Sequence, residues 1–224
     1  MNKKEIFNIL RNSFQDKMDT FQITSMEDRL IFTKRNDGLE YQNSIRCQYF
    51  GETSTLSPQG NSFRSEQIES DFMTYLIEPL KSYYNSSSTI HLSSKRFKNF
   101  DKIDFYKFTS LTQLENFIEY YLAYHQSVCE EFWYKIKSIK DIGYFLAQLP
   151  YENHTEILVG GTFPTQMFKK MYILKKCGHL ERYKEYKFKF SEQLETFPIR
   201  KPNRKEEYEL FKENFNQLIS KLEE

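Results

Sequence analysis

A glycine pair before an apolar, lysine-containing segment is the first feature of this 224-residue chain that could do chemistry. Gly161 and Thr162 precede a predicted helix, whose free amide groups could bind a phosphate, with Lys169 and Lys170 as nearby cations. The lysine that a P-loop needs directly after its glycines is missing, which excludes that motif. The sequence therefore offers these four residues as an anion site, with an ordinary turn before a helix as the alternative.

Glu185 and Lys187 are the second candidate, because metal-dependent nucleases use an acid and a lysine two residues apart on a strand to hold Mg²⁺ and orient water. Such a site also needs an aspartate from a neighbouring strand. Asp141 falls in a predicted helix, and the other upstream aspartates are distant in sequence. The simpler interpretation is a solvated edge strand over residues 186–190, in which lysine alternates with aromatic residues.

The four histidines share no short metal-ligand spacing. Cys177 and His179 supply only two ligands, whereas a closed zinc site needs four. His125 lies in the apolar row of a predicted helix, so we expect a hydrogen-bonded core residue rather than a base. No cofactor, metal or catalytic residue is assigned from the sequence. A Ser-His-Asp or Cys-His site would need long-range contacts that the sequence does not reveal.

Charge is unevenly distributed along a chain whose net charge is +1. Residues 37–78 hold seven acids against two bases, a net −5, and residues 108–131 hold four glutamates and no lysine or arginine. The first stretch predicts an acidic surface that docks a basic protein by electrostatic steering. The residues assigned to that surface are Asp37, Glu40, Glu52, Glu66, Glu69 and Asp71.

Residues 169–190 reverse the sign, with eight bases against two acids, a net +6. Tyr172, Tyr183 and Tyr186 lie among these bases, so the segment could follow a nucleic-acid backbone while its rings stack on bases. The acidic stretch and the near-zero total charge would repel the same polyanion. Nucleic acid is therefore the alternative partner, behind a basic protein.

The elements that would position these residues predict an α+β fold. Residues 108–137 carry apolar side chains at alternating steps of three and four, which predicts a long buried helix. An amphipathic helix over 3–18 opens the chain. Asn36-Asp37-Gly38 predicts a hairpin between strands at 29–34 and 39–50, within an antiparallel meander. The second half is predicted to be mainly helical, organised on the long buried helix.

The remaining predicted elements complete one domain over 1–224, with a candidate sub-boundary near 85–100 that would divide 1–84 from 101–224. They are a polar loop over 51–65, helices over 68–84, 138–148, 164–177 and 208–222, short strands near 90–92 and 103–108, and an extended connector over 197–202.

Composition and chemistry together favour a binding protein. No run approaches the roughly 20 apolar residues that cross a bilayer, and polar residues interrupt the N-terminus, so neither a membrane span nor a signal peptide is expected. Three widely separated cysteines indicate reduced thiols and a cytoplasmic protein. We predict a non-catalytic inhibitor or immunity-type protein, an antitoxin in the broad sense, that neutralises a toxin or enzyme through its acidic surface. The alternative is a nucleic-acid-binding or phosphate-handling effector or enzyme that uses residues 160–190.

Overall fold

The computed structural model describes residues 2–50, 53–82, 84, 88–92 and 106–224. Backbone contacts divide the chain into two compact units. Unit 1 comprises Met1–Phe63 and Leu92–Lys135, and unit 2 comprises Arg64–His91 and Ile136–Glu224. The chain crosses between the units three times. The crossing at 91/92 falls inside the predicted sub-boundary at 85–100, and the crossings at 63/64 and 135/136 fall outside it.

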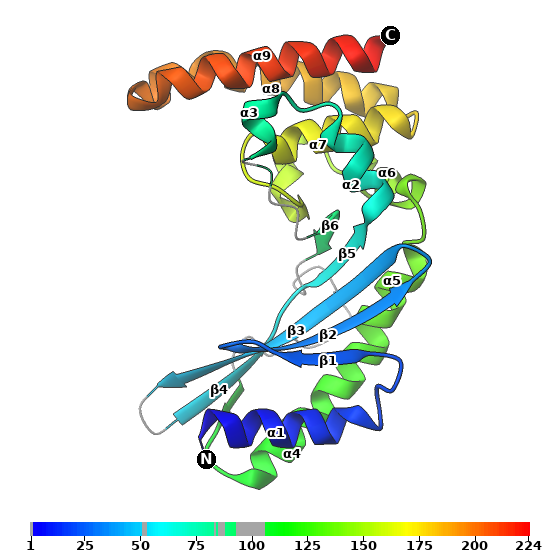
Figure 1. Cartoon of the computed structure of the whole chain (residues 1–224), viewed down its shortest axis with the longest axis vertical. Helices are drawn as coiled ribbons and strands as arrows, with labels where there is room; N and C mark the ends of the chain where they lie inside the picture. Colours follow the sequence, from blue (N-terminus) through cyan, green and yellow to red (C-terminus); the bar gives the residue numbers. More distant parts are fainter. Residues whose placement is uncertain (1, 51–52, 83, 85–87, 93–105) are drawn as a thin grey trace. The chain divides into compact units, whose positions relative to one another are not determined.

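Unit 1 contains an antiparallel meander, as the sequence predicts (Figure 1). β1 pairs with β2, β2 with β3, β3 with β4, and β4 with β7, all antiparallel, and β5 also pairs with β3. Positive φ angles at Asp37 (48°) and Gly38 (77°) form the turn between β2 and β3, which confirms the hairpin. The strands are β1 (Gln22–Ser25), β2 (Arg29–Asn36), β3 (Leu39–Phe50), β4 (Thr53–Pro58), β5 (Asn61–Ser65) and β7 (Tyr106–Phe108).

The polar loop predicted over 51–65 is wrong, because most of that segment forms β4 and β5. Leu56 and Phe63 are fully buried, and the small side chains of Ser54 and Thr55 are also buried. Serine and threonine favour loops when they are solvated, but threonine packs well on a pleated strand once a partner strand satisfies the backbone. β3 supplies that partner by tertiary pairing.

Two helical elements cover one face of this sheet. Asn2 and Glu5 form a capping box at the start of α1 (Lys3–Gln15). The predicted long helix is present as α4 (Leu111–Tyr124), a π-helical segment η2 (His125–Glu130) and α5 (Glu131–Lys135). Phe14 of α1, Phe32 of β2 and Tyr121 of α4 lie with each pair of ring centroids 5.3 Å apart. These rings join both helices to the sheet in one core.

Unit 2 is mainly helical, and β6 pairs with β8 within it. Phe190 of α8 contacts Phe163, Phe168 and Phe215, at centroid distances of 5.9, 5.6 and 5.8 Å, so α7, α8 and α9 share an aromatic core. The elements are α2 (Glu66–Met73), α3 (Glu78–Lys81), β6 (Ile90–Leu92), α6 (Ile139–Ala147), η3 (Tyr151–Glu156), β8 (Ile157–Val159), α7 (Thr165–Lys176), α8 (Leu180–Arg200), η4 (Pro202–Arg204) and α9 (Lys205–Glu223).

The predicted edge strand at 186–190 and the extended connector at 197–202 are wrong, because α8 runs through both. Its buried residues are Tyr183, Tyr186, Phe190, Leu194 and Phe197, which recur every three or four residues. Over five residues this helical pattern is indistinguishable from strand alternation, and only the longer window separates them. Pro198 lies in the last turn of α8. The backbone hydrogen bond that a proline cannot donate is therefore lost only near the end of the helix.

Candidate binding site

The predicted acidic surface begins in unit 1, where its members differ in availability. Asp37 is exposed at the hairpin turn. Glu40 forms an ion pair with Arg35 across β2 and β3, with an N–O distance of 2.7 Å. Glu52 lies outside the described residues. Asp37 is therefore the member in unit 1 whose carboxylate has no ion pair with a described residue.

The three members in unit 2 all have protein partners. Glu66 is exposed and pairs with Arg64 at 2.7 Å. Asp71 accepts a hydrogen bond of 2.6 Å from the Tyr172 hydroxyl. Glu69 is only 3% exposed, so it cannot contribute to a docking surface. Docking by the exposed members stays a prediction.

Glu69 instead lies in a buried polar network of unit 2. Its carboxylate forms an ion pair with the Lys169 ammonium and accepts hydrogen bonds from the hydroxyls of Thr89 (2.6 Å) and Tyr84. Lys169 also donates to the carbonyl of Ser88 at 3.3 Å. Burial lowers the pKa of Lys169 to about 8, and the neighbouring carboxylate opposes that change. The network joins α2, α7 and the segment before β6.

A turn does precede α7, but its amide groups are largely engaged. Gly161 has a φ of 110°, and Thr162 is exposed. The Thr162 carbonyl accepts a hydrogen bond of 3.0 Å from the Gln166 amide. The Pro164 carbonyl accepts hydrogen bonds from the amides of Met167 (2.9 Å) and Phe168 (3.2 Å). Few donors at this helix terminus are therefore free for an anion.

The two lysines of the predicted anion site are also engaged. Lys169 and Lys170 are no more than 1% exposed. The Lys170 ammonium donates to the carbonyl of His154, and burial lowers the pKa of Lys170 to about 8. Both ammonium groups thus have protein partners. The anion-site prediction retains support only from the turn itself.

Glu185 and Lys187 do not form the nuclease arrangement. They lie two residues apart on a helix, which separates their directions by about 200°. Glu185 accepts from the Tyr151 amide at 2.8 Å and pairs with Arg182, whereas Lys187 pairs with Glu223 at 2.7 Å. Both side chains connect elements of unit 2.

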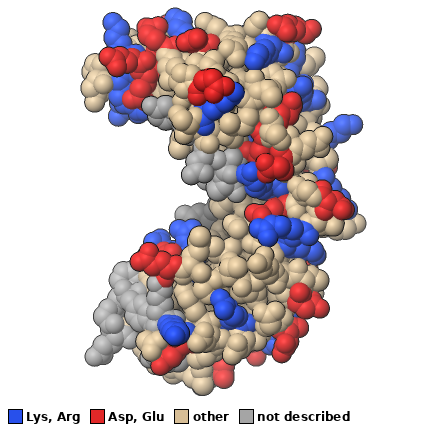
Figure 2. All heavy atoms as spheres, viewed as in Figure 1, with Lys and Arg blue, Asp and Glu red and all other residues tan. Residues whose placement is uncertain are grey.

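Positive charge in residues 169–190 is similarly balanced by nearby acids. Lys184 pairs with Glu181 at 2.8 Å, and Lys176 lies 3.9 Å from Asp71. Figure 2 shows both signs of charge intermixed over each unit in that view. Nearby acids therefore compensate most of the basic charge on which the nucleic-acid interpretation depends.

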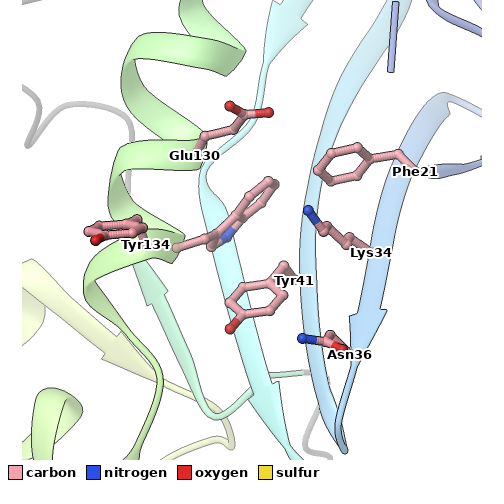
Figure 3. Close-up of a pocket in the computed structure, with 7 residues that line it drawn as sticks. Phe21, Lys34, Asn36, Tyr41, Glu130 and Tyr134 are labelled. Atoms are coloured by element: carbon pink, nitrogen blue, oxygen red, sulfur yellow. The ribbon is translucent and has the colours of Figure 1, made fainter. Parts of the chain in front are cut away.

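Unit 1 contains two adjoining hollows of about 310 and 540 Å³ beside the helix at 111–135. Both are lined by Phe21, Lys34 and Glu130. In Figure 3, Lys34 reaches from β2 towards the helix that carries Glu130, and the rings of Phe21 and Tyr41 lie on either side of it. The smaller hollow adds Asn36, Tyr41, Trp133 and Tyr134, and the larger adds polar groups of Lys17, Asp19, Thr20, His125 and Gln126.

His125 lines the larger hollow but is only 3% exposed. Its ring meets Phe21 edge-on at 4.8 Å, lies 5.5 Å from Trp133 and stacks on Tyr121 at 6.4 Å. Neither ring nitrogen has a hydrogen-bond partner in the part of the chain that the structure describes. The predicted core position is confirmed, but the predicted hydrogen bonding is wrong. Burial lowers the pKa of His125 to about 4, so the ring is neutral at pH 7.

The π-helical segment η2 begins at His125 and ends at Glu130, so it carries both residues into the hollows. Such segments occur frequently at functional sites. Cys129 within it is buried, and its sulfur accepts a hydrogen bond of 2.9 Å from the Asn43 amide. Burial raises the pKa of the Cys129 thiol to about 12, which makes it a poor nucleophile. Cys129 is therefore not suited to nucleophilic chemistry.

The outer face of the same helix is acidic. Glu115, Glu119 and Glu130 are exposed and form no ion pair with a described residue. Glu131 is paired with Lys135. We call the exposed face of residues 111–135 the acidic helix face. The sequence revealed its glutamates but gave the docking role to residues 37–78.

Tyr134 extends the acidic helix face with a side chain that is 75% exposed. Exposed aromatic residues beside carboxylates are well suited to contact a partner. No residue spacing predicted the hollows, because their walls come from residues 17–41 and 122–134. The one available signal was a histidine within an aromatic row.

The described residues contain no group of three or more histidine, cysteine, aspartate or glutamate side chains that could hold a metal ion. Within the same residues, no helix combines the length and apolarity that a membrane crossing requires. Comparison with protein-family models, curated proteins and solved structures finds no match to this chain.

Proposed function

We propose that the protein is a non-catalytic cytoplasmic binding protein of the inhibitor or immunity type, which captures a basic protein on the acidic helix face. The observation that carries this proposal is the exposure of Glu115, Glu119 and Glu130 on one helix without an ion pair to any described residue. Unlike most of the acidic residues in 37–78, these carboxylates need not give up an ion pair with a described residue when they bind.

Helix geometry supports the direction of the charge preference. Glu115 and Glu119 are four residues apart and therefore repel each other on one face of α4. A cationic partner relieves this repulsion and is steered by the local field. Tyr134, close to Glu130 in sequence, supplies a large exposed ring of the kind that dominates binding energy in protein interfaces.

A nucleic acid is the less favoured partner, because its phosphates would be repelled by this face. The inhibitor role fits a surface whose charge provides fast association, a property that neutralisation of a harmful partner requires. The cytoplasmic assignment is supported by Cys47, Cys129 and Cys177, which form no disulfide with one another.

Charge reversal on the acidic helix face tests the proposal. The double variant Glu115→Lys with Glu119→Lys should capture at least about tenfold less of a basic, stoichiometric partner from native cell lysate at low salt. Partners are identified by mass spectrometry, and high salt should weaken capture by the unmodified protein.

The matched control is Glu209→Lys with Glu213→Lys, which changes the same charges at the same spacing on the exposed side of α9 in unit 2. This control should capture the partner as the unmodified protein does. Equal capture by both double variants, or recovery of nucleic acid alone, would overturn the proposal.

A further inference from the structure

The shared space of the two hollows contains opposite charges that do not pair with each other. Lys34 and Glu130 line both hollows, yet neither forms an ion pair with a described residue. The Lys34 ammonium lies 5.6 Å from the centroid of the Phe21 ring. Figure 3 shows Lys34 on the strand side and Glu130 on the helix side. A ligand with both charges could contact each group.

A buried polar group faces the same space. His125 lines the larger hollow, is only 3% exposed and has no partner for either ring nitrogen in the described chain. A neutral imidazole has one donor and one acceptor, and leaving both unmet is unfavourable. Both ring nitrogens lie beneath the surface of the hollow, so His125 forms part of its buried wall rather than a ligand contact. Lys17 and Gln126 provide hydrogen-bond donors at the wall.

Aromatic rings form the apolar part of the wall. Trp133 lies 5.6 Å from Phe21 and 5.8 Å from Tyr41 by ring centroids. Volumes of about 310 and 540 Å³ fall within the range of small-molecule pockets. An inorganic ion would leave these rings without a contact, whereas an aromatic ligand would cover them.

We propose that unit 1 binds a small amphoteric molecule of the aromatic α-amino acid class in these hollows. Lys34 contacts the ligand carboxylate, Glu130 contacts its ammonium group, and the rings of Phe21, Tyr41 and Trp133 surround its apolar body. This site goes beyond the proposed capture of a protein, with which it shares Glu130.

The tryptophan at 133 is the only one in the chain, so its fluorescence reports on this site alone. L-phenylalanine should produce a saturable change. Two analogues, 3-phenylpropanoate without the ammonium group and 2-phenylethylamine without the carboxylate, should each bind at least about tenfold more weakly, because each loses a charge-assisted contact.

Two variants of the charged lining residues locate the binding. Lys34→Met and Glu130→Gln should each weaken L-phenylalanine binding at least about tenfold. The matched controls are Lys135→Met and Glu131→Gln. These two residues pair with each other on the helix that carries Glu130, and neither lines the hollows, so both variants should bind L-phenylalanine normally.

Three results would overturn the inference: no saturable change up to about 10 mM L-phenylalanine, equal affinity for all three probes, or binding by the Lys34 and Glu130 variants that equals binding by the unmodified protein. Folding of each variant is checked by circular dichroism. The capture experiment changes only Glu115 and Glu119, so failure of ligand binding and failure of protein capture are separately observable.

Discussion

Replacing His125 by phenylalanine should make the protein less sensitive to acid. The folded state holds this imidazole neutral, because burial lowers its pKa from 6.5 to about 4. The unfolded chain returns the group to its ordinary pKa. Between the two values the unfolded state therefore binds a proton that the folded state does not, so the free energy of unfolding falls as pH decreases.

The size of the effect follows from the two pKa values. They differ by 6.5 minus about 4, or about 2.5, and each pH unit is worth about 1.36 kcal/mol. The contribution of His125 is fully present above pH 6.5 and is lost progressively as pH falls towards 4. We expect a loss of about 3 kcal/mol over this window in the unmodified protein, and none from this position in the variant.

Urea denaturation followed by circular dichroism at several pH values between 7 and 4 provides the measurement. The difference between the stability curves of the two proteins isolates residue 125 from the other titrating groups. At pH 7 the phenylalanine variant should be more stable by about 1 kcal/mol, because an unsatisfied polar group is removed. Parallel curves over the whole range would refute the assignment of His125 as a buried neutral histidine without partners.

Two further predictions concern unit 2 and the turns. Lys169→Met alone should destabilise the fold by about 3–5 kcal/mol, because it leaves the Glu69 carboxylate buried and unpaired, and adding Glu69→Gln should recover most of the loss in urea denaturation. Additive effects of the two changes would contradict the pairing. Gly160→Ala places a Cβ 1.8 Å from the Ser88 carbonyl oxygen and should cost about 3 kcal/mol, whereas Gly38→Ala has open space and should cost about 1 kcal/mol for its φ of 77°. Thermal melting compares the two alanine variants. Equal melting temperatures would contradict the prediction, because they would mean that the backbone shifts to accommodate the Cβ at position 160.

Local physics made much of the fold predictable. Ser138 caps α6, which begins where the sequence places it, and Ser110 caps α4, which begins three residues after the predicted start at 108. The Asp37-Gly38 turn needs only the backbone preferences of its two residues. These features depend on neighbours within a few positions, so the sequence alone contains the information.

The predictions from residue patterns were wrong in two situations. In one, the helix and strand periods agree over a short segment; in the other, pairing with a distant strand turns a predicted loop into a strand. Tyr186, Phe188 and Phe190 alternate as in a strand, but Phe188 is exposed while the other two are buried on α8. The segment 53–58 forms a strand because β3 pairs with it, and no property of the segment announces that partner.

The sequence by itself determined the α+β class, the long helix of unit 1, the hairpin and the uneven charge, because each depends on composition or on short spacings. Tertiary structure decided which charges are available. It buried Glu69 against Lys169, 100 residues away, and left Glu115 and Glu119 exposed on α4. It also assembled the two hollows from segments far apart in the chain, with His125 in the wall of the larger one. Burial, pairing and pKa are properties of the surroundings that folding creates, so they cannot be read from residue types alone.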